Sequence, residues 1–407
     1  MSQLYFPSLE AGKATGDGPA SSAELQGALC GLLCTDSQAN RITWYKSLFE
    51  DIHPDEDAHI GSIKYYSQYW DPPIVGDPRS LDSYQDPWGV SRLDDLGVSY
   101  FMAGKFRALV QFLFADENFI ARAFNAFLFL MFFVMSRDKR CLLFLAPLLC
   151  SPQIWYLYAY ANRGSFVLFV SILLAWQLVN KKSALNLFLS AAKYLDNWRY
   201  ALFPGLLLGI LSIEQTNYIL FILFVFSVLL WRLLFFVKQK KIFFYKCLFF
   251  LLIGVSVFSL RYALDVSING SNKLAQRTAY AEQYATPEFK PSNASTARSY
   301  SGLRLRDKGV PIMGLFQPEW DWHKMTFKSF TGFYGYYAEY SPKWYYAYVL
   351  LVYVIVFLTL LWNTIFEANW RYKLFTVLTL TALSGGVLMG VLFSWLYDFQ
   401  PQGRYIF

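Results

Sequence analysis

The sequence predicts an all-α, polytopic membrane protein with about eight transmembrane helices, an outer amino-terminal segment and a large outer loop. Hydrophobic residues make up 55% of the 407 residues and charged residues only 16%, a balance too apolar for an ordinary soluble domain. About eight apolar runs approach the roughly 20 residues that cross about 30 Å of hydrocarbon. Basic residues are concentrated in alternate connections between these runs. Lipid is therefore the expected solvent of most of the chain.

The apolar runs fall into two groups, one within residues 118–260 and one within residues 345–407. We place the runs at residues 118–135, 141–160, 165–179, 199–211, 217–237, 242–260, 345–362 and 374–397. The third and fourth are the shortest. The polar stretch between the two groups, residues 261–344, is the predicted large outer loop.

The orientation follows from the connections after the first, third, fifth and seventh runs, because Lys and Arg are retained on the cytoplasmic side. Their basic residues are Arg137, Lys139, Arg140, Lys181, Lys182, Lys238, Lys240, Lys241, Arg371 and Lys373. Residues 1–117, 261–344 and 398–407 are then expected on the outer side of a bacterial inner membrane. Much of the net charge of +7 lies in the cytoplasmic connections, which favours the lipid bilayer over nucleic acid as a partner.

Residues 1–52 differ in character from the rest, since they are polar and contain neither an apolar span nor a signal peptide. A capping-box pattern at residues 21–24 predicts a short helix. Residues 23–34 and 44–51 resemble the first helices of the small, soluble, all-helical YecA/YgfB-like family, whose function does not carry over. A leading membrane helix, needed to place this segment outside, is expected to be missing.

The segment 53–117 combines an acidic motif with a predicted interfacial helix. The motif Asp55-Glu56-x-x-His59 precedes a stretch rich in Tyr, Trp, Pro and Asp. Residues 96–114 have the pattern of an amphipathic helix that lies in the interface on the outer side. A carboxylate of the motif can take a proton from an acceptor hydroxyl, which is general-base work. The same pattern is also typical of a solvated acidic run.

This arrangement resembles the GT-C class of membrane glycosyltransferases, which combine an outer-loop acidic residue, interfacial helices and many aromatic-rich spans. Two motifs narrow the likeness to a family of uncharacterised bacterial membrane proteins related to that class, over residues 54–407. They are Pro54-Asp55-Glu56-x-x-His59 and Gln402-Gly403-Arg404-Tyr405. The resemblance implies that Asp55 is the catalytic base, with Glu56 as the alternative. It also implies that a polyprenyl-phosphate-linked sugar is the donor at the outer face.

The carboxylate pair can instead bind a divalent cation, as in some members of the class. The sequence identifies no further oxygen ligands that Mg²⁺ would need, so we assign no metal site and leave the cofactor open. His59 is expected to position the site or line it, because no second histidine has metal-ligand spacing.

Arg404 is the first candidate for binding a lipid phosphate, because a guanidinium donates forked hydrogen bonds to phosphate oxygens and stays charged. Gln402 and Tyr405, beside it in the motif, are further candidates for substrate binding, and Gly403 lets the backbone come close to a neighbour. Arg163 is a weaker candidate on the same face. Both arginines can alternatively be anchors at the lipid headgroups.

The large outer loop adds aromatic and basic candidates. Trp320 and Trp322 offer ring faces that stack on sugars, or that dip into the aromatic belt of the interface. Arg298, Arg304 and Arg306 form a basic cluster that would hold a lipid-linked glycan in a polymerase or ligase.

Four functional hypotheses remain from the sequence. The first is a transferase that moves a sugar from a lipid-phosphate carrier to a glycan, lipid or protein, and the second is the polymerase or ligase. A transporter or flippase would need charged groups within its spans. These spans are expected to be nearly free of them, with Arg122 near an end and Arg199 and Glu214 at boundaries. The last is a non-functional chimeric fragment, fused near residue 53 and cut short after Phe407.

Overall fold

The computed structural model describes residues 55–85, 88–114, 116–194, 196–214, 218–292, 305–334, 339–397 and 399–403. The chain divides into two compact units, Met1–Thr43 and Trp44–Phe407, and the description below concerns the second. The helices predicted within residues 1–52 and the YecA/YgfB-like likeness lie outside the described residues.

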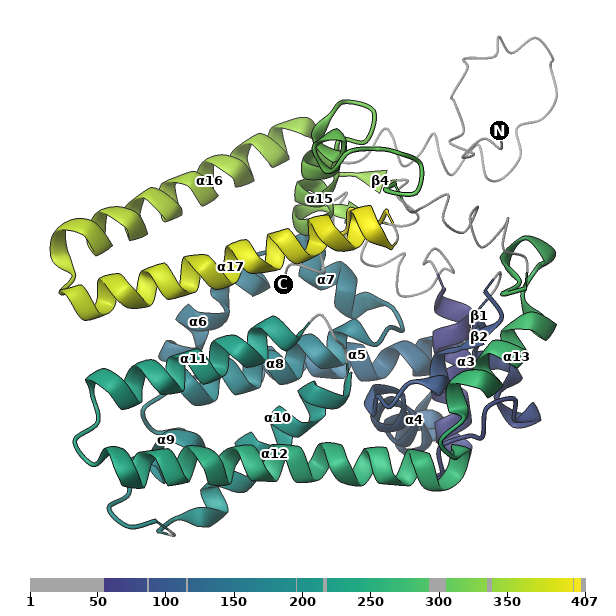
Figure 1. The fold of residues 1–407 in the computed structure, drawn as a ribbon, viewed down its shortest axis with the longest axis horizontal. Coiled ribbons are helices and arrows are strands. Elements are labelled where there is room, and N and C mark those ends of the chain that lie inside the picture. The colour runs from purple at the N-terminus through teal and green to yellow at the C-terminus, as the bar shows by residue number, and fades with distance from the viewer. Residues whose placement is uncertain are drawn as a thin grey trace. The chain divides into compact units, whose positions relative to one another are not determined.

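The segment before the first long apolar helix folds into two packed helices and a small hairpin (Figure 1). Its elements are α3 (Glu56–Gln68), η1 (Pro78–Ser83), β1 (Tyr84–Gln85), β2 (Val90–Ser91), η2 (Arg92–Asp94), α4 (Ser99–Val110) and η3 (Gln111–Leu113). The strands are antiparallel, with Tyr84 opposite Ser91. A Cβ at Gly104 of α4 would lie 2.6 Å from Tyr66 of α3, so a glycine is needed where these helices cross.

The helix predicted at residues 96–114 corresponds to α4 and η3. Its buried face includes Tyr100 and Ala103, whereas Leu109 and Phe112 are 70% and 80% exposed. Large apolar side chains on one face and packing on the other are what an interfacial helix requires.

Five helices among the described residues are long and apolar enough to cross a membrane. They are α5 (Glu117–Met135), α8 (Gly164–Val179) continued by α9 (Ala184–Ser190), α12 (Lys240–Asn269), α16 (Lys343–Trp362) continued by the π-helical turn η9 (Asn363–Glu367), and α17 (Trp370–Leu396). The helices α6 (Lys139–Leu149) and α7 (Pro152–Ala159) are bent by 85° and make a sixth span if the pair is counted as one. The described chain is thus mostly helical, with five or six candidate spans.

Each of the eight apolar runs contains a helix, but several differ in length from the predicted run. The run at 199–211 forms the turn η4 (Trp198–Ala201) and then α10 (Leu202–Glu214, 13 residues), and the next run forms α11 (Ile219–Phe235, 17 residues). The break between α6 and α7 lies next to two prolines: Pro147 is near the end of α6, and Pro152 is the first residue of α7. Proline lacks the N–H that a continuous helix uses, so it favours a break here. In the other direction, α12 continues past the predicted end at residue 260 to Asn269.

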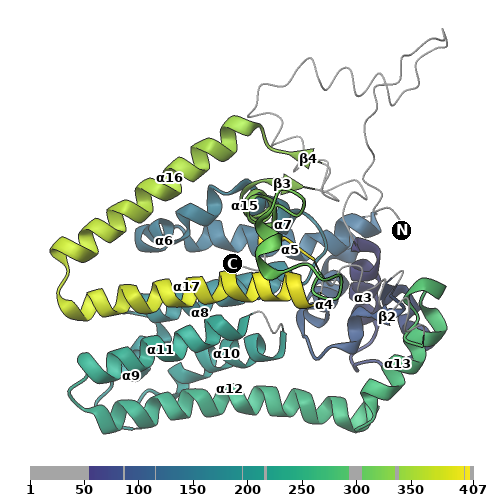
Figure 2. The ribbon, with the colours of Figure 1, turned by 45° about the horizontal axis from the view of Figure 1, so that its top comes forward.

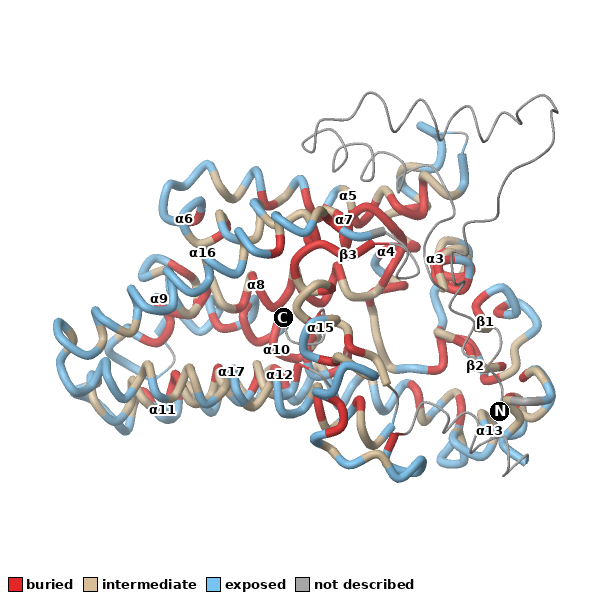
Figure 3. The backbone as a smooth tube through the Cα atoms, turned by 90° about the horizontal axis from the view of Figure 1, so that it is seen from above, coloured by how far each residue is buried: buried red, intermediate tan, exposed pale blue. Residues whose placement is uncertain are grey.

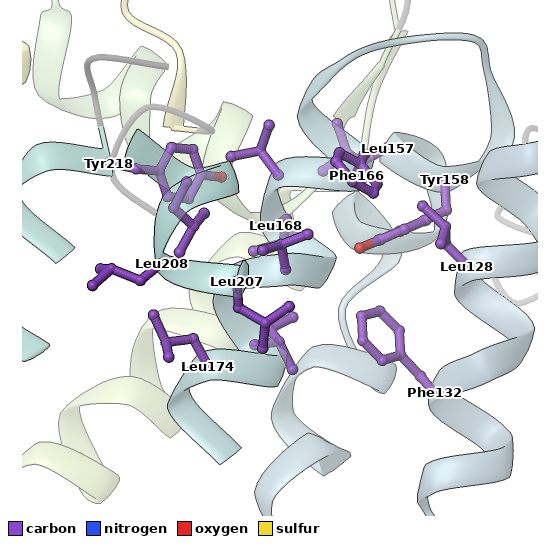
Figure 4. Packing of buried hydrophobic residues seen from close by; sticks show 14 of the residues in the cluster. Leu128, Phe132, Leu157, Tyr158, Phe166, Leu168, Leu174, Leu207, Leu208 and Tyr218 are labelled. Carbon is purple, nitrogen blue, oxygen red and sulfur yellow. The ribbon is translucent and has the colours of Figure 1, made fainter. Parts of the chain in front are cut away.

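The largest apolar core lies among α5, α7, α8 and α10 (Figure 4). Phe132, Leu174 and Leu211 are fully buried in it. The rings of Phe132 and Tyr158 meet edge to face at 5.5 Å between centroids. Buried positions concentrate in the same region when the chain is viewed from above (Figure 3). This core fixes the helices that carry the polar residues described below.

Two glycines bring α10 and α12 unusually close together. A Cβ at Gly209 would lie 2.5 Å from Cβ of Val257, and a Cβ at Gly205 would lie 2.6 Å from the side chain of Ile253. Small residues at a helix crossing let two backbones approach in a membrane. The α10–α12 contact therefore depends on the absence of side chains at Gly205 and Gly209.

The polar stretch after α12 forms short elements that pack at the ends of the long helices. They are α13 (Lys273–Tyr284), η6 (Pro287–Phe289), η8 (Ile312–Phe316), α15 (Trp322–Thr331), β3 (Phe333–Tyr334) and β4 (Glu339–Tyr340). β3 and β4 pair antiparallel. Leu305, Leu315, Trp322 and Val391 form a second small core that joins this stretch to α17. In Figure 2, α16 and α17 meet at one end and separate toward α15.

The two ends of the helices differ in what they carry. Figure 1 shows the α11–α12 and α16–α17 turns at one end, and α3, α4 and α13 at the other. We call the latter the α3 end. Its location on the outer side of a membrane is a prediction from the basic residues in the opposite turns.

Candidate functional site

Asp55 lies at the α3 end, immediately before the first residue of α3. Its backbone is left-handed, with φ 63° and ψ 10°, a conformation that is uncommon outside glycine and is better tolerated by Asp and Asn. Its carboxylate accepts a hydrogen bond of 2.9 Å from Nη2 of Arg92, and the two side chains are 37% and 29% exposed. Asp55 is thus a held but accessible carboxylate.

Glu56, the alternative base, is in a different environment. Its side chain is 3% exposed and accepts hydrogen bonds of 2.8 Å from both Nε and Nη2 of Arg122 and from the backbone N–H of Ala161. A buried carboxylate with this many partners is not free to bind a cation beside Asp55. The geometry therefore favours a structural function for Glu56 and leaves Asp55 as the candidate base.

His59 follows one turn later on α3 and contacts the interfacial helix. Its Nδ1 lies 2.6 Å from the hydroxyl of Tyr100, and both side chains are buried. Burial raises the pKa of Tyr100 to about 12, so this hydroxyl stays protonated at neutral pH. The contact fixes the first turn of α3 against α4.

Arg163 is held by two carboxylates rather than left open for a phosphate. Its Nε donates to Glu214 and its Nη1 to Asp95, each at 2.8 Å. Glu214 also accepts the backbone N–H groups of Val98 and Ser99 at 2.7 Å. This network joins the starts of α8 and α4 to the end of α10. In this structure the side chain of Arg163 therefore links helices through Glu214 and Asp95.

The connection between α7 and α8 is fastened to α5 by polar contacts. Asn125, one turn after Arg122 on α5, donates to the carbonyl oxygen of Tyr160 at 2.6 Å. Asn162 accepts the N–H of Ser165 at 2.9 Å and so starts α8. The backbone around Ala161, whose N–H binds Glu56, is therefore held from both sides.

Helix α13 closes the α3 end over the hairpin. Arg277 lies 3.5 Å from Asp94 and 3.9 Å from Asp95. Burial raises the pKa of Asp94, and Arg277 opposes that shift. Gly76, at φ 81°, passes so close to the ring of Tyr280 that no side chain fits there. The predicted outer loop and the segment before α5 thus build one site together.

The two tryptophans proposed for sugar stacking have different settings. Trp322 is 3% exposed and donates from Nε1 to Ser394 at 2.9 Å, which places it inside the second core with no open ring face. Trp320 is half-buried, with its ring 5.1 Å from that of Phe399. Trp320 is the better candidate for contact with a ligand or with lipid.

The segment that ends in the second motif packs on α15. The N–H of Gly403 donates to Oγ of Ser329 at 2.6 Å, and a Cβ there would collide with the backbone of Phe330. The close approach expected at Gly403 is therefore made to α15. Gln402 is half-buried, and its Oε1 is buried without a hydrogen-bond partner among the described residues. Arg404 and Tyr405 lie outside the described residues.

The basic cluster of the second hypothesis is only partly described. Arg298 and Arg304 lie outside the described residues. The guanidinium of Arg306 lies 5.8 Å from the ring centroid of Trp395, so it packs on α17. In the described parts of the chain, no three His, Cys, Asp or Glu side chains are grouped so that they could hold a metal ion.

The expectation that the spans are nearly free of charge is wrong at two positions. Lys246 of α12 is 1% exposed and donates to the carbonyl oxygens of Phe188 and Ala191 at 2.6 and 2.8 Å. Arg232 of α11 donates to Oδ1 of Asn186 at 2.6 Å. Both charges hold α9 and its flanks at the end opposite the α3 end.

Sequence reasoning did not find the partner of the candidate base, because Arg92 was not singled out. Arg122 and Glu214 were noted only as charges near the ends of spans, although buried charge within or beside an apolar run is a known signal of a specific contact. Arg92 lies in a polar stretch, where nothing distinguishes it from a solvated residue.

No protein-family model, curated protein or solved structure matches this chain. The functional argument therefore depends on the geometry at the α3 end.

Proposed function

We propose that the protein is a membrane glycosyltransferase that moves a sugar from a polyprenyl-phosphate carrier to an acceptor on the outer face of the membrane. In this proposal all eight apolar helices lie in the bilayer, the α3 end faces outward, and the membrane is a bacterial inner membrane. The observation that carries the proposal is Asp55, an accessible carboxylate held in a left-handed conformation beside an arginine.

The reaction needs one base and one place for the leaving phosphate. Asp55 takes the proton of the acceptor hydroxyl while the acceptor oxygen forms a bond to the anomeric carbon. The bond between that carbon and the phosphate oxygen breaks, and its electron pair leaves with the polyprenyl phosphate. A positioned general base contributes about 10²–10⁴-fold to such a step. Unusual backbone conformations cluster at sites of this kind, which supports Asp55 over its neighbours.

The chain offers a matched pair of carboxylates for a test. Asp57 lies two residues from Asp55 on the same helix start and is exposed. We expect Asp55→Asn to lower transfer from a polyprenyl-phosphate sugar about 10²–10⁴-fold in proteoliposomes, because asparagine keeps the left-handed backbone but not the basicity. Asp57→Asn should transfer as the wild type does. Equal activity of all three proteins would refute the assignment of the base.

A further inference from the structure

We propose that Arg92 binds the phosphate of the donor, and that the Asp55–Arg92 ion pair is the resting state from which that phosphate releases the base. The inference rests on the proposed function, since it names how the same site recognises its donor. The ligand chemistry is a phosphate ester on an isoprenoid lipid. Asp55 occupies the place on Arg92 that a phosphate oxygen would take.

Several arginines lie at the α3 end, and most are already committed. Arg277 lies between the carboxylates of Asp94 and Asp95. Arg122 is 1% exposed and is bound by both oxygens of Glu56. Arg163 is 11% exposed and bridges two carboxylates. Neither Arg122 nor Arg163 can bind a phosphate without giving up contacts that hold helices together.

Arg92 differs in both respects. Its side chain is 29% exposed, and its hydrogen bond to a described partner is the single one from Nη2 to Asp55. Its Nε is buried and has no hydrogen-bond partner among the described residues. A guanidinium has five donors in a planar fork that matches phosphate oxygens. Arg92 therefore has unused donors and a partner that it can exchange.

The backbone that carries Arg92 is rigid, as a binding residue requires. Ser91 caps the turn η2 by accepting the N–H of Leu93 at 3.0 Å, while the N–H of Ser91 donates to Asp94. β2 pairs with β1 just before this turn. Arg92 can thus change partner by side-chain rotation while its Cα stays in place.

Asp55 is suited to the other half of the exchange. It precedes α3, yet its side chain accepts no capping hydrogen bond from that helix. Its carboxylate is held by Arg92 and is 37% exposed. Exposed ion pairs of this kind contribute little to stability because water and salt screen them, so a phosphate can replace Asp55 at low cost. The freed carboxylate is then available to the acceptor hydroxyl.

The test measures binding and transfer separately. Purified protein in nanodiscs is titrated with farnesyl phosphate, farnesol and inorganic phosphate, and binding is followed by intrinsic tryptophan fluorescence. We expect farnesyl phosphate to bind more tightly than either of the other probes. Arg92→Gln should weaken its binding about ten- to a hundred-fold, as expected for a lost charge-assisted contact, and Arg92→Lys should bind with intermediate affinity.

The variant Asp55→Asn tests whether Asp55 competes with the phosphate for Arg92 or merely holds Arg92 in place. Because it removes the competing charge, it should tighten the binding of farnesyl phosphate by up to about five-fold, although it lowers transfer. Arg79→Gln is the matched control, since Arg79 lies in the same segment and pairs with Asp77 at the surface. It should bind as the wild type does, and thermal unfolding of each variant checks folding.

Several results would overturn the inference. These are equal binding by Arg92→Gln and wild type, weaker binding by Asp55→Asn, and binding of farnesol as tight as that of farnesyl phosphate. If inorganic phosphate binds as tightly as farnesyl phosphate, the claim that the ligand is a lipid phosphate is wrong. Arg92-dependent binding in a protein that transfers no sugar would refute the proposed function alone, whereas transfer with Arg92-independent binding would refute this inference alone.

Discussion

The α3 end and the α16–α17 hairpin are held in place by different forces. In the most apolar stretch of α5, which reaches the α3 end, 44% of residues are buried, compared with none in α16 and 6% in α17. Charged and polar contacts such as Glu56–Arg122 fix the first region. Lipid is as apolar as a leucine side chain, so apolar surface alone does not drive helices together in a bilayer.

The hairpin makes its specific contacts near its ends. Trp322 binds Ser394 near the end of α17, and Nε1 of Trp231 on α11 donates to the carbonyl oxygen of Arg371 at 3.1 Å. Between these points α17 presents Gly386 with open space around it. Polar contacts and close packing thus hold the α3 end at many points and the α16–α17 hairpin at few.

The largest expected effect comes from breaking the buried ion pair. Glu56→Ala leaves Arg122 buried without its carboxylate, which should lower the free energy of unfolding by about 3–5 kcal/mol. Unfolding by SDS in mixed micelles measures the loss. Asp82→Ala removes a surface pair with Lys64 at 3.8 Å and should cost less than about 1 kcal/mol. Similar losses in both variants would show that burial does not distinguish the two pairs.

The next effect compares one substitution in two helices. Gly209→Ala forces a methyl group against Val257 and should destabilise the protein by about 1–3 kcal/mol, as overpacking does. Gly386→Ala enters open space in the middle of a helix and should stabilise by up to about 1 kcal/mol. The same SDS titration measures both. Changes of the same sign would contradict the contrast between the two regions.

The smallest effect concerns pH at the α3 end. Burial raises the pKa of Asp94 above its unfolded value, so its protonated form is favoured by folding and its ionised form is penalised. Its contribution to stability is therefore best below the unfolded pKa and declines as pH rises through the folded pKa. Asp94→Asn should lose this decline. Unfolding of both proteins at several pH values between 3 and 7 measures it, and parallel curves would exclude a contribution from Asp94.

The sequence predicted where helices occur better than how they end. Every apolar run contains a helix, because hydropathy depends on local composition. The break between Pro147 and Pro152 was overlooked since the run at 141–160 remains apolar across it. The end of α12 was predicted too early because the apolar run stops where polar residues such as Asp265 begin. In the structure the helix continues through Asp265, whose carboxylate pairs with Lys273.

The candidate site was predicted only in part. Asp55 was proposed from its motif, but its partner Arg92 is remote in sequence, and no local pattern pairs the two residues. Trp322 was assigned to the surface because aromatic residues in a polar loop have no pattern that shows burial. Partners within a site depend on how distant segments fold together, and composition does not contain that information.

The ammonium group of Lys246 has a consequence for how this protein is assembled during synthesis. It satisfies the backbone oxygens of Phe188 and Ala191 at the end of α9, and such groups are costly to leave unpaired in a bilayer. Residue 246 leaves the ribosome well after residue 191, so α9 is made before its cap exists. We therefore expect the end of α9 to reach its final contacts only after α12 has been made.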